Sequence, residues 1–315
     1  MAENTESTLG MVFPGQGSQA VGMLAELAEL HAVVTDTFEE ASDVLGYDLW
    51  ALAQDGPAET LNLTDRTQPS MLAAGVSVWR VWQAEGGAVP AVMAGHSLGE
   101  YTALVCAGAL ALPDAISLVA GRGRCMQAAV PAGSGAMAAI LGLEDASVAA
   151  VCEQAAGGQV VTAVNFNSPG QVVIAGETAA VQRAMELAKE QGAKRAVQLP
   201  VSVPSHCDLM QPAAERFAER LRATQFRSPG IPVIQNVDVV AHDSPDAIRD
   251  GLERQLYSPV QWVRTIESMA GRGVSRVIEA GPGKVLAGLC KRIDRSLAAL
   301  PVYDPDTLAK AMITS

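Results

Sequence analysis

The pentapeptide Gly-His-Ser-Leu-Gly at residues 95–99 constrains the fold of this chain more than any other feature. Residues 91–94 before it are apolar, which predicts a short buried strand, and residues 100–107 after it predict a helix. The pattern Gly-x-Ser-x-Gly between a strand and a helix is typical of a nucleophile elbow, a tight turn that exposes the serine hydroxyl beside free helix N–H groups. The alternative is a glycine-rich turn in which Ser97 only caps the helix. Because both flanking elements are predicted, we interpret Ser97 as reactive.

The composition describes a folded globular protein. Of the 315 residues, 49% are hydrophobic and 18% are charged, so the chain can bury one large core or two modest ones. The formal net charge of −12 argues against general binding to nucleic acids or to an anionic membrane surface. The longest apolar stretch, residues 103–112, reaches only about half of a membrane span and contains Gly108. We therefore predict no nucleic acid partner and no membrane insertion.

The N-terminus and the cysteines favour a cytoplasmic protein. Residues 1–7 are polar and acidic, unlike a signal or transit peptide. The cysteines are odd in number and form no C-x-x-C pair, so neither a disulfide framework nor a structural zinc is predicted. Residues 281–284 (Gly-Pro-Gly-Lys) are followed by Val285 where a phosphate loop requires Ser or Thr, so we interpret them as a turn between a strand and a helix. We expect no cofactor and no metal.

Strand patterns alternate with helical patterns along most of the chain. The predicted strands are residues 9–13, 91–94, 233–236 and 274–279. The predicted helices include residues 20–30, 33–45 and 71–82. Such alternation is typical of βαβ units around a parallel sheet, so we predict an α/β fold with an α/β-hydrolase-like core.

Residues 130–202 follow a different order. They predict a strand, a helix, two strands, a helix and a strand, at residues 136–142, 145–156, 160–166, 171–176, 178–191 and 195–200. This βαββαβ order is typical of a ferredoxin-like fold. We therefore predict a small subdomain, residues 130–202, inserted into a large catalytic one made of residues 1–129 and 203–315.

A serine nucleophile needs a base, and histidine is the usual one. The chain has four histidines: His31, His96, His206 and His242. His96 precedes Ser97 and should point away from the hydroxyl, while two others lie in a helical segment and a polar loop. His206, where the chain returns from the small subdomain, is the best candidate by elimination. No acidic partner for it is obvious, and Asp238 and Glu279 both remain open.

Three segments together resemble one enzyme family. They are residues 13–19 (Phe-Pro-Gly-Gln-Gly-Ser-Gln), 95–101 (Gly-His-Ser-Leu-Gly-Glu-Tyr) and 203–206 (Val-Pro-Ser-His). This combination resembles the malonyl-CoA:acyl-carrier-protein transacylases of type II fatty acid synthesis. The resemblance extends over essentially the whole chain and includes residues 165–171, 254–257 and 281–286.

The resemblance implies transfer of a malonyl group from malonyl-CoA to the phosphopantetheine thiol of acyl carrier protein. Ser97 would accept the malonyl group in a ping-pong reaction, and His206 would take the serine proton and return it to the leaving thiol. The backbone N–H groups of Gln16 and Leu98 would form an oxyanion hole. The backbone carbonyl of Gln255 would orient His206, in place of a carboxylate.

The resemblance also makes Arg122 the group that binds the malonyl carboxylate, through two parallel hydrogen bonds. The alternative is an arginine on a helix surface, and we assign that position to Arg124. From charge complementarity with an acidic carrier protein we predict docking through two basic pairs: Lys194, Arg195, Lys291 and Arg292. Ordinary solvated surface is the alternative for these four.

Two other functional classes share parts of this pattern. A serine hydrolase, such as a thioesterase, would have the same serine and histidine but would pass the acyl group to water. A non-catalytic binding module would keep the fold without forming an acyl-serine.

Overall fold

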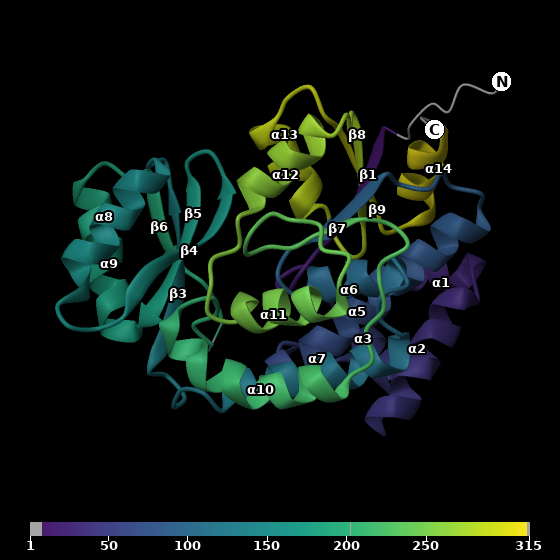
Figure 1. Cartoon of the computed structure of the whole chain (residues 1–315), viewed down its shortest axis with the longest axis horizontal. Coiled ribbons are helices and arrows are strands. Elements are labelled where there is room, and N and C mark those ends of the chain that lie inside the picture. The colour runs from purple at the N-terminus through teal and green to yellow at the C-terminus, as the bar shows by residue number, and fades with distance from the viewer. Residues whose placement is uncertain (1–7, 202, 314–315) are drawn as a thin grey trace.

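The structure is a computed structural model that describes residues 8–201 and 203–313. These residues contain two separate sheets, one of five strands and one of four, which lie on opposite sides of Figure 1. Residues 1–7, which we interpreted as unlike a signal peptide, lie outside the described residues, as does residue 202 at the end of the predicted small subdomain.

Five parallel strands form the first sheet, in the order β7-β2-β1-β8-β9. Their bounds are β1 Leu9–Phe13, β2 Val92–Gly95, β7 Val233–Ile234, β8 Arg276–Ala280 and β9 Ala298–Val302. The parallel sheet that the alternating pattern predicts is thus confirmed. Since parallel strands end at the same edge of a sheet, the loops that follow β1, β2 and β7 come together there.

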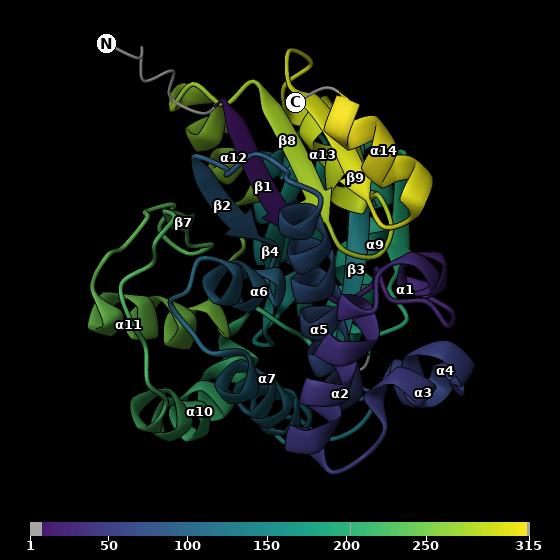
Figure 2. The same cartoon turned by 90° about the vertical axis from the view of Figure 1, so that its right-hand side faces the viewer.

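Helices cover both faces of the parallel sheet, as Figure 2 shows. Their bounds are α1 Ala25–Leu30, α2 Val33–Leu45, α3 Leu49–Asp55, α4 Ala58–Leu61, α5 Thr64–Ala84, α6 Gly99–Cys106, α7 Leu112–Gln127, α10 Gln211–Ala223, α11 Pro245–Gln255, α12 Trp262–Gly271, α13 Val285–Ile293 and α14 Pro305–Ile313. A short 3-10 helix, η1 Asp208–Met210, precedes α10. The turn predicted at residues 281–284 does connect β8 to α13.

The alternation of side chains along β1 explains how both faces are filled. Met11 and Phe13 pack into the core cluster that includes α5, α6 and α7. Val12, between them, packs into a second cluster with Trp262 of α12 and Leu286 of α13. Because successive side chains of a strand point to opposite faces, a strand that is apolar throughout fits a sheet with helices on both sides.

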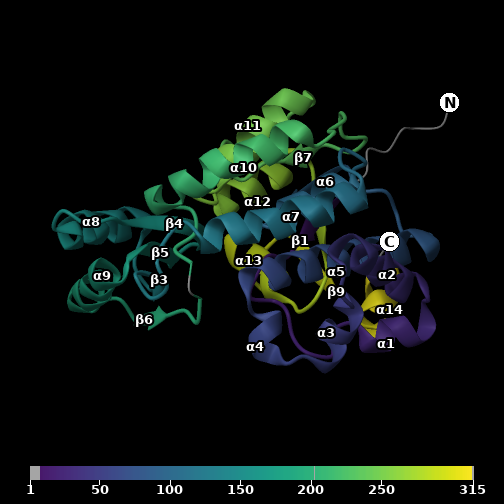
Figure 3. The ribbon, with the colours of Figure 1, turned by 90° about the horizontal axis from the view of Figure 1, so that it is seen from below.

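The second sheet is antiparallel and has the order β4-β5-β3-β6. Its elements follow the chain as β3 Gly135–Leu141, α8 Asp145–Ala156, β4 Val161–Ser168, β5 Gln171–Glu177, α9 Thr178–Glu190 and β6 Arg195–Gln198, which is the predicted βαββαβ order. Helices α8 and α9 cover one face (Figure 3). The other face, which includes Met137 and Val164, packs against Cys207, the residue after His206. The subdomain boundaries themselves stay a prediction.

Several elements differ from the sequence prediction; helix α5, for example, begins at Thr64 rather than at residue 71. Helix α1 begins only at Ala25, because Leu24 before it has a left-handed backbone with φ of 63°. Strand β7 ends at Ile234 rather than at Asn236, and the two residues after it leave the sheet. Strand β9 was not predicted. It is an edge strand that contains Pro301, and proline is tolerated at a sheet edge because one N–H there needs no partner.

Candidate active site

Ser97 lies on the tight turn that the sequence predicts. The turn joins β2 to α6, and Ser97 has a φ of 52°, in the left-handed region. A Cβ on Gly95 would lie 1.8 Å from the carbonyl carbon of Gly99, and a Cβ on Gly99 would lie 2.0 Å from the Phe13 oxygen. Only glycine therefore fits at either position. Helix α6 has no side-chain cap, so the interpretation of Ser97 as a mere helix cap is wrong.

His206 is the histidine that meets the serine. Its Nε2 lies 2.8 Å from Ser97 Oγ, and its Nδ1 lies 2.7 Å from the backbone oxygen of Gln255. Since a carbonyl oxygen only accepts, Nδ1 carries the proton and Nε2 is free to accept one from the hydroxyl. Burial, together with the charge of Arg122, lowers the pKa of His206 to about 3. The imidazole is therefore neutral at neutral pH, as a general base must be.

The acidic residues that the sequence left open as partners of this histidine are engaged elsewhere. Asp238 pairs with His242 and Arg254 on the surface, at 3.1 Å and 3.0 Å. Glu279 accepts hydrogen bonds from two backbone N–H groups at the start of α13. The neighbour of the serine, His96, bonds to Asn167 at 2.8 Å instead of to the hydroxyl.

The loop after β1 brings Gln16 to the serine turn. A Cβ on Gly15 would lie 2.5 Å from the backbone oxygen of His96 and 3.8 Å from the backbone nitrogen of Leu98, so the loop and the turn are in direct contact. No hydrogen bond uses the backbone N–H of Gln16 or of Leu98 within residues 8–201 and 203–313. Both residues line the same cavity as Ser97. Two unused N–H groups beside a serine hydroxyl are what an oxyanion hole requires.

Arg122 of α7 is buried, so the alternative of a surface arginine is wrong. Its Nη1 donates to Gln68 at 3.0 Å, its Nη2 donates to the side chain of Gln255 at 2.9 Å, and Nη2 lies 3.5 Å from Ser97 Oγ. No carboxylate forms an ion pair with it among the residues that the structure describes. Arg124 is exposed. A buried cation whose hydrogen bonds go to neutral oxygens can receive the carboxylate of a ligand.

Gln255 has a second function that sequence reasoning missed. Besides its backbone oxygen on His206, its side-chain oxygen accepts from Arg122 and its side-chain nitrogen donates to the backbone oxygen of Ser97 at 3.1 Å. Gln68, which holds the other end of the guanidinium, was missed as well. No motif signals such roles, because glutamine is common on helices and only the packing of α5, α7 and α11 brings these groups together.

These groups share one cavity of about 110 Å³. Ser97, His206 and Arg122 line it, and Met137 and Leu199 from the region of the antiparallel sheet form another part of its wall. In the described part of the chain no three His, Cys, Asp or Glu side chains gather to hold a metal ion. The cavity thus offers a serine hydroxyl, a neutral imidazole, two N–H groups and a guanidinium.

Comparison with known proteins shows where this arrangement occurs. The sequence pattern of the acyl transferase domain matches residues 11–308. The chain is 60% identical over 301 residues to the malonyl CoA-acyl carrier protein transacylase of Escherichia coli K12, across 96% of this chain and 97% of that protein. The chain belongs to this transacylase family. The family resemblance seen in the sequence is confirmed, and the chain is an enzyme.

Solved transacylases of the family share the whole fold. An acyl carrier protein S-malonyltransferase from Vibrio cholerae is 62% identical, with a TM-score of 0.94, and the match covers 96% of this chain and 99% of that one. A malonyl-transacylase in complex with its type II PKS acyl-carrier protein is 56% identical, with a TM-score of 0.97, over 98% of this chain and 100% of that one. The α/β fold with a parallel and an antiparallel sheet is therefore that of the family.

Two of the four basic residues predicted to bind a carrier protein line a common groove. Arg195 of β6 and Arg292 of α13 border it, together with Lys284, which we predicted to lie in a turn but not to bind the carrier protein. Lys194 and Lys291 are exposed but lie outside this groove. The groove is about 470 Å³ in volume and lies between the antiparallel sheet and α13.

No helix within residues 8–201 and 203–313 is both long and apolar enough to cross a membrane.

Proposed function

We propose that this enzyme transfers malonyl groups from malonyl-CoA to the phosphopantetheine thiol of acyl carrier protein, through a malonyl-Ser97 intermediate, in fatty acid biosynthesis. The observation that carries the proposal is the buried Arg122 guanidinium 3.5 Å from the Ser97 hydroxyl, in one cavity with His206. A serine hydrolase needs the hydroxyl and the imidazole but has no use for a buried cation beside them.

The first half-reaction forms the acyl-serine. Ser97 Oγ attacks the thioester carbonyl carbon of malonyl-CoA while His206 Nε2 takes the hydroxyl proton. The N–H groups of Gln16 and Leu98 stabilise the negative oxygen of the tetrahedral intermediate. The carbon–sulfur bond then breaks, and the proton on His206 goes to the departing coenzyme A sulfur.

The second half-reaction runs the same steps in reverse with a different thiol. His206 takes the proton of the phosphopantetheine thiol, whose sulfur attacks the malonyl ester carbon. The ester bond to Ser97 breaks, and the proton returns to Ser97 Oγ. Since an acyl group moves between sulfur and oxygen without redox change, the proposed reaction needs no cofactor.

Whether the malonyl group on Ser97 is transferred to the carrier protein or to water distinguishes this function from that of a serine hydrolase. With malonyl-CoA alone, we expect malonyl-Ser97 to accumulate, as a mass increase on the peptide that contains Ser97. Added holo acyl carrier protein should then receive the malonyl group. Release of malonate at a rate that does not depend on the carrier would instead indicate a hydrolase, and the absence of any acyl-serine would indicate a binding module.

The carrier protein is proposed to dock at the groove between β6 and α13. Arg195, Lys284 and Arg292 supply positive charge around it, on a chain whose formal net charge is −12. Val197 and Val285, both exposed, line it as well. A positive rim with apolar contacts fits an acidic partner that binds briefly and leaves.

Neutralising this rim should slow transfer to the carrier without slowing formation of the acyl-serine. For Arg195→Ala/Arg292→Ala we expect kcat/KM for acyl carrier protein to fall about tenfold at low salt, because charge steering raises association rates by at least that factor. The difference should shrink as salt rises. Arg216→Ala, which removes an exposed charge on α10, is the control. Equal effects of the two changes would refute this docking surface.

We also propose that the enzyme works in the cytoplasm. All five cysteines are free, as is usual in a reducing compartment.

A further inference from the structure

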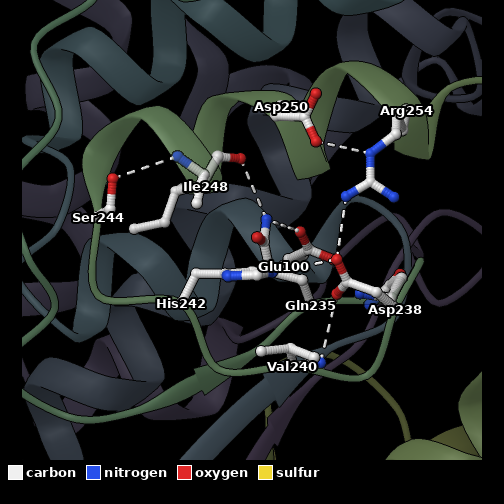
Figure 4. A network of polar contacts seen from close by, with 11 residues as sticks. Glu100, Gln235, Asp238, Val240, His242, Ser244, Ile248, Asp250 and Arg254 are labelled. Carbon is white, nitrogen blue, oxygen red and sulfur yellow. Dashed lines mark hydrogen bonds and ion pairs between the residues drawn. The ribbon is translucent and has the colours of Figure 1, made fainter.

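A fully buried carboxyl group lies behind the catalytic turn, and the proposed reaction does not use it. Glu100 is in the first turn of α6, three residues after Ser97, and has no exposed surface. Its Oε1 accepts from the side-chain nitrogen of Gln235 at 2.9 Å, and its Oε2 accepts from the backbone nitrogen of Asn236 at 2.8 Å. No ion pair involves Glu100 within the described residues. Figure 4 shows the carboxyl group among its neighbours.

Asn236 connects this carboxyl group to the serine. Its side-chain oxygen accepts from the backbone nitrogen of Ser97 at 2.7 Å, and its side-chain nitrogen donates to the backbone oxygen of Gly95 at 2.7 Å. Asn236 thus holds the turn on both sides of His96. Gln255 holds the far side of the serine, through the Ser97 backbone oxygen. Both polar backbone groups of Ser97, its N–H and its carbonyl oxygen, are therefore held by hydrogen bonds from other elements.

The order of the strands places Asn236 at the turn. Strand β7 lies beside β2, with Ile234 opposite Ala94, and both strands run in the same direction. The two residues after Ile234 therefore leave the sheet next to the residues after Ala94. Helix α6 starts from the same turn. Glu100, in its first turn, therefore lies within hydrogen-bonding distance of the Asn236 backbone.

We propose that Glu100 and Asn236 are positioning residues for the nucleophile, with Glu100 acting through Asn236 to keep Ser97 in its left-handed conformation. A serine with φ of 52° is in a sparsely populated region and stays there only when its surroundings hold it. Each oxygen of the carboxyl group accepts one N–H bond, whereas an amide in the same place would turn its own NH2 group toward one of these two donors. This inference rests on the proposed role of Ser97.

Burial of this carboxyl group costs free energy of hydration. Burial raises the pKa of Glu100 to about 7, against interactions with Gln235, Asn236 and the side chain of Gln255 that favour the ionised form. An apolar residue would fill the same space without this cost, but it would leave the N–H groups of Gln235 and Asn236 without this acceptor. Retaining a carboxyl group here makes sense if the direction of its hydrogen bonds matters.

The test distinguishes an effect on the position of Ser97 from an effect on the stability of the fold. The rate of Ser97 modification by diisopropyl fluorophosphate, a serine-directed reagent that needs no malonyl group, is measured with the transfer kinetics and the thermal midpoint. We expect Glu100→Gln to react about tenfold more slowly and Asn236→Ala about 100-fold more slowly, because a small displacement of a reacting atom has effects of that size. The KM for malonyl-CoA should change little, since neither change removes a hydrogen-bond partner of Arg122.

The double variant and a matched control decide the mechanism. If Glu100 acts through Asn236, Glu100→Gln/Asn236→Ala reacts no more slowly than Asn236→Ala alone. Glu279→Gln makes the same change at another fully buried carboxyl group that accepts two N–H bonds, and it should lower the thermal midpoint while leaving the Ser97 rate unchanged. Should Asn236→Ala fold poorly, Glu100→Gln alone decides, since it preserves the side-chain volume.

Two results would overturn the inference: a Glu100→Gln variant that reacts at the wild-type rate, or a double variant whose loss equals the product of the single losses. A wild-type protein that reacts with the reagent and yet transfers no malonyl group would overturn the proposed function instead, and would leave the positioning role intact.

Discussion

Replacing Ser97 by alanine is expected to abolish the acyl-enzyme and to lower malonyl transfer by about 10⁴-fold or more, because nucleophile and base act as one unit and loss of either removes most of their joint effect. The hydroxyl lies 2.8 Å from His206 Nε2, and the other ring nitrogen, Nδ1, is bonded to the Gln255 carbonyl oxygen. The variant should still fold, since the turn is held by Gly95 and Gly99 and by backbone hydrogen bonds.

The measurement is intact-mass spectrometry after incubation with malonyl-CoA, followed by a transfer assay with holo acyl carrier protein. Ser205→Ala is the matched control, because Ser205 lines the same cavity and its hydroxyl makes no hydrogen bond to the described part of the chain. This control should still acquire the malonyl group. If Ser97→Ala kept activity near that of the wild type, another residue would be the nucleophile.

Replacing Arg122 by alanine is expected to remove the preference for malonyl over acetyl groups. The guanidinium can bind the malonyl carboxylate with two charge-assisted hydrogen bonds, each of about 1.5–3 kcal/mol. Since about 1.4 kcal/mol corresponds to a factor of ten in rate, kcat/KM for malonyl-CoA should fall by about 10²- to 10⁴-fold. Acetyl-CoA has no carboxylate and leaves the buried charge unpaired in the wild type, so its rate should not fall in parallel.

The test compares malonyl-CoA and acetyl-CoA side by side as donors for the acyl-serine. Arg124→Ala is the control, because Arg124 lies two residues further along α7 and is exposed. Its malonyl-to-acetyl ratio should equal that of the wild type. An unchanged ratio in Arg122→Ala would exclude this arginine from the substrate site, whatever the loss of overall activity.

The catalytic turn was predictable because its requirements are local. The space between β2 and α6 admits only glycine at two positions, and that restriction is visible in five consecutive residues. Helices such as α2 and α8 were predicted with their observed bounds for the same reason, since a helical pattern repeats within a few residues. The end of β7 was not predictable, because Asn236 leaves the sheet for hydrogen bonds to residues 139 and 141 positions earlier in the chain.

His206 was chosen by elimination among four histidines and by family resemblance, whereas its partner could not be derived at all. The group on Nδ1 is the backbone oxygen of Gln255, and every residue has such an oxygen. No carboxylate orients His206, so neither of the two acidic candidates could have been correct. Asp238 and Glu279 were left open because a sequence does not say which acidic residues are already paired.

The sequence by itself determined the features that depend on neighbouring residues. These are the serine on its tight turn, the two characteristic orders of strands and helices, and the family of the chain. What only the tertiary structure decided is which distant groups meet this serine. Parallel strands end at one edge of their sheet, so the strand order brings the loops of Gln16, Ser97 and Asn236 together, although long stretches of chain separate them. Local steric limits depend on adjacent residues and can be read from a short segment. The strand order depends on the burial of whole sheet faces, so no single residue indicates it.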